Sequence, residues 1–150
     1  MGTLYEISAN GNRKYTGSYL EDIGTSILTI NAPSQSDLDE TNPADPAYCF
    51  TGIDDVSVII ITGLTGNRDI SWLPAPTSDG KRLLLINGVP GSGSRDIDLE
   101  HEDSGSWATT ERINNANGNA CRLDGTATGS SFVWLIYVAE RWRTSSNQTW

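Results

Sequence analysis

Hydrophobic residues recur along this chain in short stretches separated by turn residues, and no stretch shows the 3.6-residue period of an amphipathic helix. Ser26–Ile30 alternates β-branched and polar residues, and Arg82–Asn87 follows the turn signal Asp79-Gly80. Further strands are predicted at 55–62, 69–73, 97–101, 109–113, 120–123, 131–138 and from Arg141 onward. Closely spaced strands with turns between them predict an all-β fold, a β-sandwich or jelly-roll-like barrel, with helix close to absent.

Two of these segments are apolar on both faces. Residues 55–62 contain consecutive isoleucines from Ile59 to Ile61, and 131–138 is the strongest strand candidate in the chain. A strand that is apolar on both sides lies between two layers or at an interface between subunits. Trp134, inside the second segment, is therefore expected to be buried in the core or in a subunit contact.

The first third of the chain is more polar than the rest. Residues 1–24 are rich in turn residues, and 32–48 contains three prolines and four acids. The isolated aromatic residues of the first segment are Tyr5, Tyr15 and Tyr19. We interpret the first segment as an extended arm and the second as a surface loop. The chain is accordingly divided into an N-terminal arm and loop-rich region, 1–50, and a C-terminal β module, 51–150.

The formal charge is −9, from 19 acidic and 10 basic residues. With no basic run, this excludes a conventional nucleic-acid interface and argues against docking on anionic membranes. The N-terminus lacks the regions of a signal peptide, and the longest apolar stretch is too short to span a bilayer. Cys49 and Cys121 lie outside any Cys-x-x-Cys pair or histidine cluster, so we expect two buried free thiols in a protein made in a reducing cytoplasm, and no zinc site.

Four acidic residues alternate along one predicted strand, which places their side chains on one face. They are Asp96, Asp98, Glu100 and Glu102. Carboxylates in a row are able to hold Ca²⁺ or to supply an acid/base pair. We favour a solvated outer face with Ile97, Leu99 and His101 pointing inward, because like charges on an exposed strand discourage edge pairing. Whether the acidic strand binds a cation stays open.

No catalytic constellation is recognisable in the sequence. His101 is the only histidine, and without a nucleophile and an orienting acid we expect it to be a hydrogen-bonded core residue. Gly88–Ser94 is glycine-rich but lacks the Lys-Ser/Thr ending of a phosphate loop, so we interpret it as a hairpin loop. We therefore predict a protein that is not an enzyme and that has no cofactor, catalytic or metal-binding residues.

From about residue 70 to 144, short motifs follow one another in a recognisable order. They are Asp79-Gly80-Lys81-Arg82-Leu83, Asp103-Ser104-Gly105-Ser106, Arg112-Ile113, Leu135-Ile136-Tyr137 and Arg141-Trp142-Arg143. Together they resemble a β module of bacteriophage structural proteins, which include tail fibres, head fibres and capsid decoration proteins. The chain departs from that pattern at Val138, where the family often has Asp, and at Gly88–Ser94, so partner specificity is not carried over.

The resemblance implies assembly, as a homotrimer, and attachment to a virion. The short length of the chain favours a capsid decoration (cement) protein. Such a protein binds the major capsid protein and stabilises the head, after assembly in the bacterial host cytoplasm. The alternative is a tail-fibre or head-fibre tip that binds host surface glycans through exposed aromatic residues.

The expected partners are the major capsid protein or other virion proteins, and further copies of this chain. The residues expected in contacts between subunits or with partners are Tyr5, Tyr15, Tyr19, Trp134, Arg141, Trp142, Arg143 and Trp150. Arg141 and Arg143 are also expected to pair with the acidic strand of the same or an adjacent subunit.

Overall fold

The computed structural model describes the chain in segments. Backbone and side chains are described for residues 26–34, 38, 50, 52–89, 95–103, 108–125 and 131–144, and the backbone alone for 6–7 and 13–14. Strands β1 (Glu6–Ile7) and β2 (Arg13–Lys14) form an antiparallel pair that joins no other described strand.

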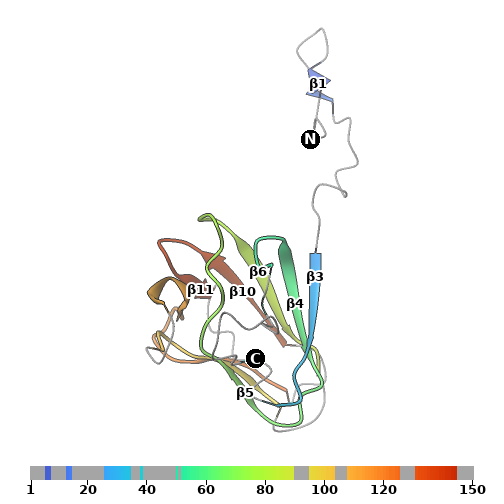
Figure 1. Cartoon of the computed structure of the whole chain (residues 1–150), viewed down its shortest axis with the longest axis vertical. Helices are drawn as coiled ribbons and strands as arrows, with labels where there is room; N and C mark the ends of the chain where they lie inside the picture. The colour runs from blue at the N-terminus through green and yellow to red at the C-terminus, as the bar shows by residue number, and fades with distance from the viewer. Residues whose placement is uncertain are drawn as a thin grey trace.

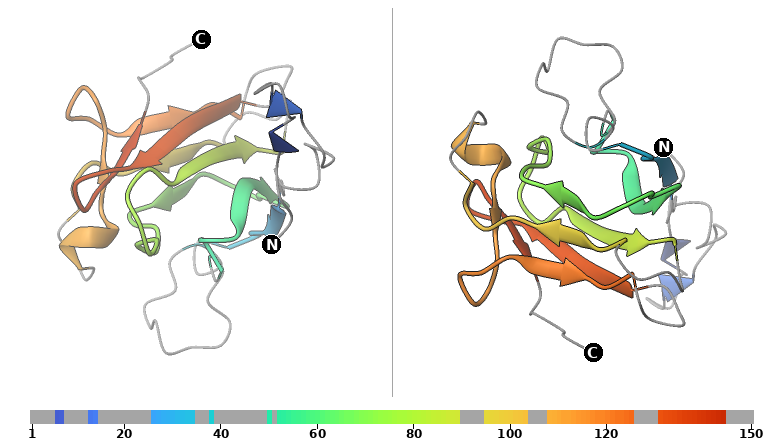
Figure 2. Two further views of the ribbon diagram at one scale, coloured as in Figure 1. Left: turned by 90° about the horizontal axis from the view of Figure 1, so that it is seen from above. Right: turned by 90° about the horizontal axis from the view of Figure 1, so that it is seen from below.

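The remaining strands form two mixed sheets (Figures 1 and 2). The six-stranded sheet has the order β3 (Ser26–Asn31), β4 (Val56–Thr62), β6 (Arg82–Asn87), β10 (Ser131–Tyr137), β11 (Trp142–Thr144) and β8 (Ile113–Asn114). The three-stranded sheet has the order β5 (Arg68–Ile70), β7 (Ile97–Leu99) and β9 (Cys121–Leu123). The all-β expectation is confirmed, and the one helical turn in the described chain is the 3-10 helix η2 (Thr109–Glu111).

From β4 to β7 the chain winds alternately through the two sheets. β4 and β6 belong to the larger sheet, while β5 and β7 belong to the smaller one. As a result, β4 and β6 are parallel neighbours, and so are β5 and β7, as in successive coils of a solenoid. β9 and β10 then pair antiparallel with β7 and β6, and β11 pairs antiparallel with β10.

The expected β-sandwich or jelly-roll-like barrel is therefore wrong, because the described strands form a solenoid-like arrangement of two mixed sheets. Its strand pairs β3–β4, β4–β6, β5–β7 and β8–β11 are all parallel. Gly88–Ser94 is also not a hairpin loop, because the strands on either side of it lie in different sheets. The physical reason is that alternation of apolar residues reports which side chains face inward, and it carries no information about which strands pair or in which direction.

Both sheets contribute to one hydrophobic core. Its strand residues include Ile59, Ile61, Leu83, Leu85, Val133 and Leu135 from the larger sheet and Ile70, Ile97, Leu99 and Leu123 from the smaller one. Trp72 and Trp142 are fully buried in this core, so Trp142, expected in contacts between subunits, packs inside the single chain. The ring of Trp72 meets the ring of Phe50 edge-on, with centroids 5.9 Å apart.

Most predicted strands are present with shifted ends. The predicted strand at 82–87 has the observed bounds, whereas the one at 109–113 is wrong over most of its length, because η2 occupies 109–111 and β8 begins only at Ile113. Cys121 is a buried free thiol, as expected, and Cys49 lies outside the described residues. Within the described chain, no helix has the length and hydropathy needed to cross a membrane.

Candidate interaction surface

The side of the six-stranded sheet that faces away from the core is largely apolar. We call this surface the outer face. It consists of Ile27, Thr29, Val58, Ile60, Arg82, Leu84, Ile86, Phe132, Trp134, Ile136 and Arg143. Each of these residues alternates along its strand with more deeply buried ones, as the burial pattern of β6 and β10 shows most clearly.

Strand register arranges this face in rows that cross four strands. One row contains Ile27, Val58, Leu84 and Trp134, and the next contains Thr29, Ile60, Ile86 and Phe132. Ile27, Phe132 and Trp134 are 58%, 57% and 48% exposed. Single exposed apolar side chains are ordinary, but a contiguous apolar patch on a soluble domain marks an interaction site.

A groove lies at the β10 side of the outer face. It has a volume of about 360 Å³ and is lined by Arg82, Trp134, Leu135 and Ile136. Arg82 is directly opposite Ile136, and Arg143 is opposite Ile136 on the other side, so two guanidinium groups flank this end of the apolar rows. No residue of the outer face is acidic, although the chain has a net charge of −9.

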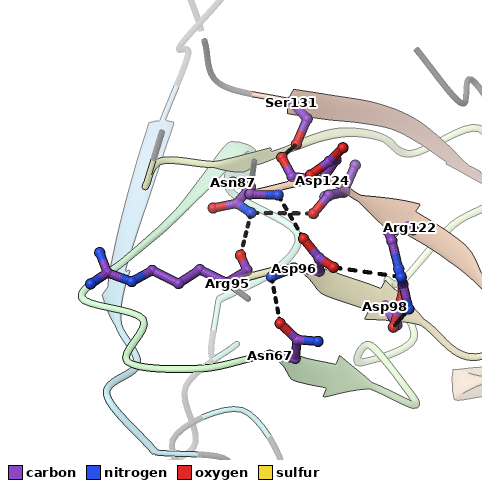
Figure 3. Close-up of polar contacts among 10 residues, drawn as sticks. Asn67, Asn87, Arg95, Asp96, Asp98, Arg122, Asp124 and Ser131 are labelled. Carbon is purple, nitrogen blue, oxygen red and sulfur yellow. Dashed lines mark hydrogen bonds and ion pairs between the residues drawn. The ribbon is translucent and has the colours of Figure 1, made fainter. Parts of the chain in front are cut away.

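The three-stranded sheet has a very different exterior. Asp69, Asp98 and Arg122 stand opposite one another across its three strands. Arg122 donates two 2.8 Å hydrogen bonds to Asp98, from Nε to Oδ1 and from Nη2 to Oδ2 (Figure 3). The bond to this carboxylate, with its charge, raises the pKa of Arg122 above its ordinary value.

Asp96 has a structural role at the start of β7. It is 8% exposed, and its Oδ1 accepts a 2.8 Å hydrogen bond from the backbone N–H of Gly125. Its own N–H donates to Asn67 Oδ1, and the neighbouring buried Asn87 donates from Nδ2 to the carbonyls of Arg95 and Leu123 (Figure 3). These bonds hold β6, β7 and β9 together, so the Asp96 carboxylate has a structural role in connecting the strands.

The acidic strand is only partly the solvated ladder that the alternation predicted. Ile97 and Leu99 point inward as expected, but β7 ends at Leu99 and Glu102 has a φ of +47°, which breaks the alternation. Asp96 is buried rather than solvated. Within the described residues, no three His, Cys, Asp or Glu side chains are grouped as metal ligands.

The two glutamates beyond β7 have opposite electrostatic environments. Burial, and then the charges of Asp69, Asp98 and Asp103, raise the pKa of Glu100. A hydrogen bond from Asn114 lowers the pKa of Glu102 against the opposing effect of burial, and Arg141 lowers it further. Arg141 Nε lies 3.2 Å from Glu102 Oε1, so the expected pairing of Arg141 with the acidic strand occurs within the chain.

Other sequence-predicted residues are placed as follows. His101 is half-buried, and its Nδ1 accepts a 3.0 Å hydrogen bond from the N–H of Asn115, so the expected hydrogen bond is present. Trp134 is exposed in the single chain, whereas Trp142 is buried and donates from Nε1 to the carbonyl of Pro74. Arg143 donates a hydrogen bond to Asn114 Oδ1, at 3.4 Å, and among the described residues it forms no ion pair with an acidic side chain.

Tyr5, Tyr15, Tyr19 and Trp150 lie outside the described residues, and contact between subunits remains a prediction for the whole set. Sequence reasoning missed Ile27, Leu84 and Phe132 as members of one surface. A signal was present in Arg82–Asn87, which is apolar at both odd and even positions, as are the two segments that were recognised.

Comparison with known proteins does not assign the chain to a family. No protein-family model matches it, and no solved structure does. It is 25% identical over 131 residues to Protein BZZ1 of Schizosaccharomyces pombe. The match covers 87% of this chain and 18% of that protein, so the chain spans less than a fifth of the curated relative.

Proposed function

We propose that this protein is a non-enzymatic, self-assembling structural protein of a bacteriophage particle, a homotrimeric capsid decoration protein that binds the major capsid protein and stabilises the head. The observation that carries self-assembly is the outer face, whose two apolar rows cross four strands without an acidic residue. The bacteriophage setting and the trimer rest on the resemblance of about residues 70–144 to phage structural modules.

The energetics favour burial of the outer face. Ile27, Phe132 and Trp134 each leave about half or more of their surface in water. Removing apolar surface from water contributes about 25 cal/mol per Å², so a contact that covers three or four such side chains in each copy contributes several kcal/mol. A closed trimer would bury this face in every copy, with the virion as the final location and other virion proteins as the remaining partners.

The mass of the purified protein in solution tests self-assembly. We expect light scattering to give a mass corresponding to three chains or a multiple of three. Phe132→Ser combined with Trp134→Ser should break the trimer and lower the mass, while the protein retains the β-sheet circular dichroism spectrum, because both side chains lie outside the core. Phe132→Leu with Trp134→Phe, which keeps both positions apolar, should leave assembly intact. A monomeric wild-type protein would refute this part of the proposal.

Binding to empty heads of its own phage tests the particle assignment. Sedimentation of the protein with heads that lack it should show stoichiometric binding that saturates. Heads with the protein bound should also disrupt at a higher temperature than bare heads, since a ligand that binds only the intact state stabilises it. Assembly into trimers without head binding would retain self-assembly and reject the decoration role.

The groove supports a second candidate function, the fibre tip that binds host surface glycans. Trp134 presents an exposed indole beside Arg82, and such a pair can stack on a sugar ring and donate hydrogen bonds to it. A glycan array tests this candidate. Binding that Trp134→Ala abolishes would favour the tip, and an array without any signal would reject it.

A further inference from the structure

The two edges of the six-stranded sheet differ in how they are protected. At one edge, β8 is only two residues long, and its Asn114 contacts Glu102 and Arg143 through its side chain. At the other edge, β3 is six residues long and has no charged residue, proline or glycine (Figure 1). Within the described chain β3 pairs only with β4. A long uncharged edge of this kind is a template for a further strand.

Hydrogen bonds at the end of β3 show which of its backbone groups face the open side. The N–H of Ala32 donates to the carbonyl of Thr62, and Thr62 Oγ1 donates to the carbonyl of Ile30, so even-numbered residues direct their backbone groups toward β4. Because the direction alternates along a strand, Ile27, Thr29 and Asn31 direct theirs away from β4. All three are exposed, as is Ser26 at the start of the strand.

We propose that β3 pairs antiparallel with β3 of a second copy, about a two-fold axis that passes beside Thr29. In this register Thr29 is opposite Thr29 of the second copy, and Ile27 is opposite Asn31. Each opposed pair exchanges two N–H···O=C bonds, so all three open residues of both strands are satisfied. Leu28 is then opposite Ile30, which extends the inner apolar side across the junction.

The uncharged sequence of β3 makes this edge the place where a second copy can bind. Two chains of net charge −9 repel each other, so they associate best through surfaces that lack carboxylates. β3 has none, and neither do its row neighbours Val58 and Ile60. The proposal rests on the proposed self-assembly in that both require contact between copies. It adds a two-fold contact at the sheet edge that would link trimers in pairs, made by the backbone of β3 and not by the side chains of the outer face.

Cysteine cross-linking tests the register directly. Opposed residues of a hydrogen-bonded antiparallel pair have Cα atoms about 5.5 Å apart, within the range that a disulfide bridges. Thr29→Cys should therefore give a covalent dimer under mild oxidation, seen by non-reducing electrophoresis. Ile27→Cys is the matched control, because its counterpart in the second copy would be about 14 Å away along the strand.

The wild-type protein, with Cys49 and Cys121, sets the background for this experiment. No covalent dimer of Thr29→Cys above that background would overturn the proposal, as would equal cross-linking of Ile27→Cys.

A backbone variant separates this contact from the outer face. Thr29→Pro removes an N–H that does not bond to β4 and blocks pairing at the centre of the junction. The mass by light scattering should fall by half, whereas Thr29→Val should keep the wild-type mass. Unchanged mass for Thr29→Pro, in protein that retains its β-sheet spectrum, would overturn β3 pairing and leave the outer-face assembly standing. A wild-type protein that forms dimers and no trimers, together with a Thr29→Pro variant that forms no dimers, would reject the trimer and support β3 pairing.

Discussion

The outward side chains of both sheets follow the same two-residue alternation, but they form a charged surface on one sheet and an apolar surface on the other. On the three-stranded sheet, the outward residues Asp98 of β7 and Arg122 of β9 form a hydrogen-bonded ion pair. On the six-stranded sheet, the outward residues form apolar rows with arginines at one end and no acid. On the first exterior Asp98 is paired with Arg122 within the chain, whereas on the second Ile27, Phe132 and Trp134 stay exposed among the described residues. This difference is what the proposed self-assembly through the outer face requires, with the smaller sheet left to solvent.

The largest expected effect is a difference in the free energy of unfolding between variants on the inner and the outer side of the six-stranded sheet. Trp142→Ala should lower the free energy of unfolding by about 3–5 kcal/mol, because it leaves a cavity in the core and removes the hydrogen bond to Pro74. Trp134→Ala should lower that of the monomer by less than about 1 kcal/mol, because the side chain is half exposed. Urea unfolding of both variants, each combined with Phe132→Ser and studied at a protein concentration where light scattering shows monomers, measures the contrast. Similar losses would mean that the outer face belongs to the core.

A smaller loss of stability is expected at the hydrogen bonds that connect the three-stranded sheet to the six-stranded one. Asp96→Ala should lower the free energy of unfolding by about 1–3 kcal/mol, since the buried N–H of Gly125 loses its acceptor. Thermal unfolding by circular dichroism measures it. Ser26→Ala, at an exposed position of β3, serves as a control for the loss of a small polar group. An Asp96→Ala protein as stable as the control would show that this carboxylate does not hold the strands together.

The charged pair on the smaller sheet should contribute less again. Arg122→Ala should cost about 0.5–1 kcal/mol, because the Arg122 side chain is 55% exposed and solvent screens its pairing with Asp98. The loss should shrink as salt concentration rises in urea unfolding experiments. Arg82→Ala on the outer face should change monomer stability by less than this and should not depend on salt. A larger effect at Arg82 would reverse the comparison between the two exteriors.

The smallest effects concern the two glutamates beyond β7, and they have opposite signs. The pKa of Glu100 is raised in the folded protein, so its stabilising contribution is present below the unfolded pKa, near 4.5, and is lost as pH rises through the folded pKa. Glu100→Gln should therefore raise stability at pH 7 by a few tenths of a kcal/mol.

The pKa of Glu102 is lowered, so its contribution is present above the unfolded pKa and is lost as pH falls through the folded pKa. Glu102→Gln should lower stability at pH 7 by about 0.5 kcal/mol, and the loss should disappear in acid. Urea unfolding at pH 7 and pH 3 measures both variants. The same sign for both at pH 7 would contradict these environments.

The sequence by itself determined the all-β character, the position of most strands and the presence of segments that are apolar on both faces. These features are local, because they depend on side-chain type and spacing along one strand. The run Arg82–Asn87 was recognisable with its observed bounds, and the inward side chains of Ile97 and Leu99 followed from alternation.

Only the tertiary structure decided which strands pair and which of two apolar faces is inside. In β10, Val133 and Leu135 point inward and Trp134 points outward, yet both sets are apolar, so spacing could not distinguish them. The parallel coils of β4 to β7 and the Arg141–Glu102 pair likewise join residues far apart in sequence. Contacts of this kind form when whole strands pack against one another. For that reason local patterns marked single strands as apolar on both faces but could not join them into one outer face or show that the edge of β3 is open.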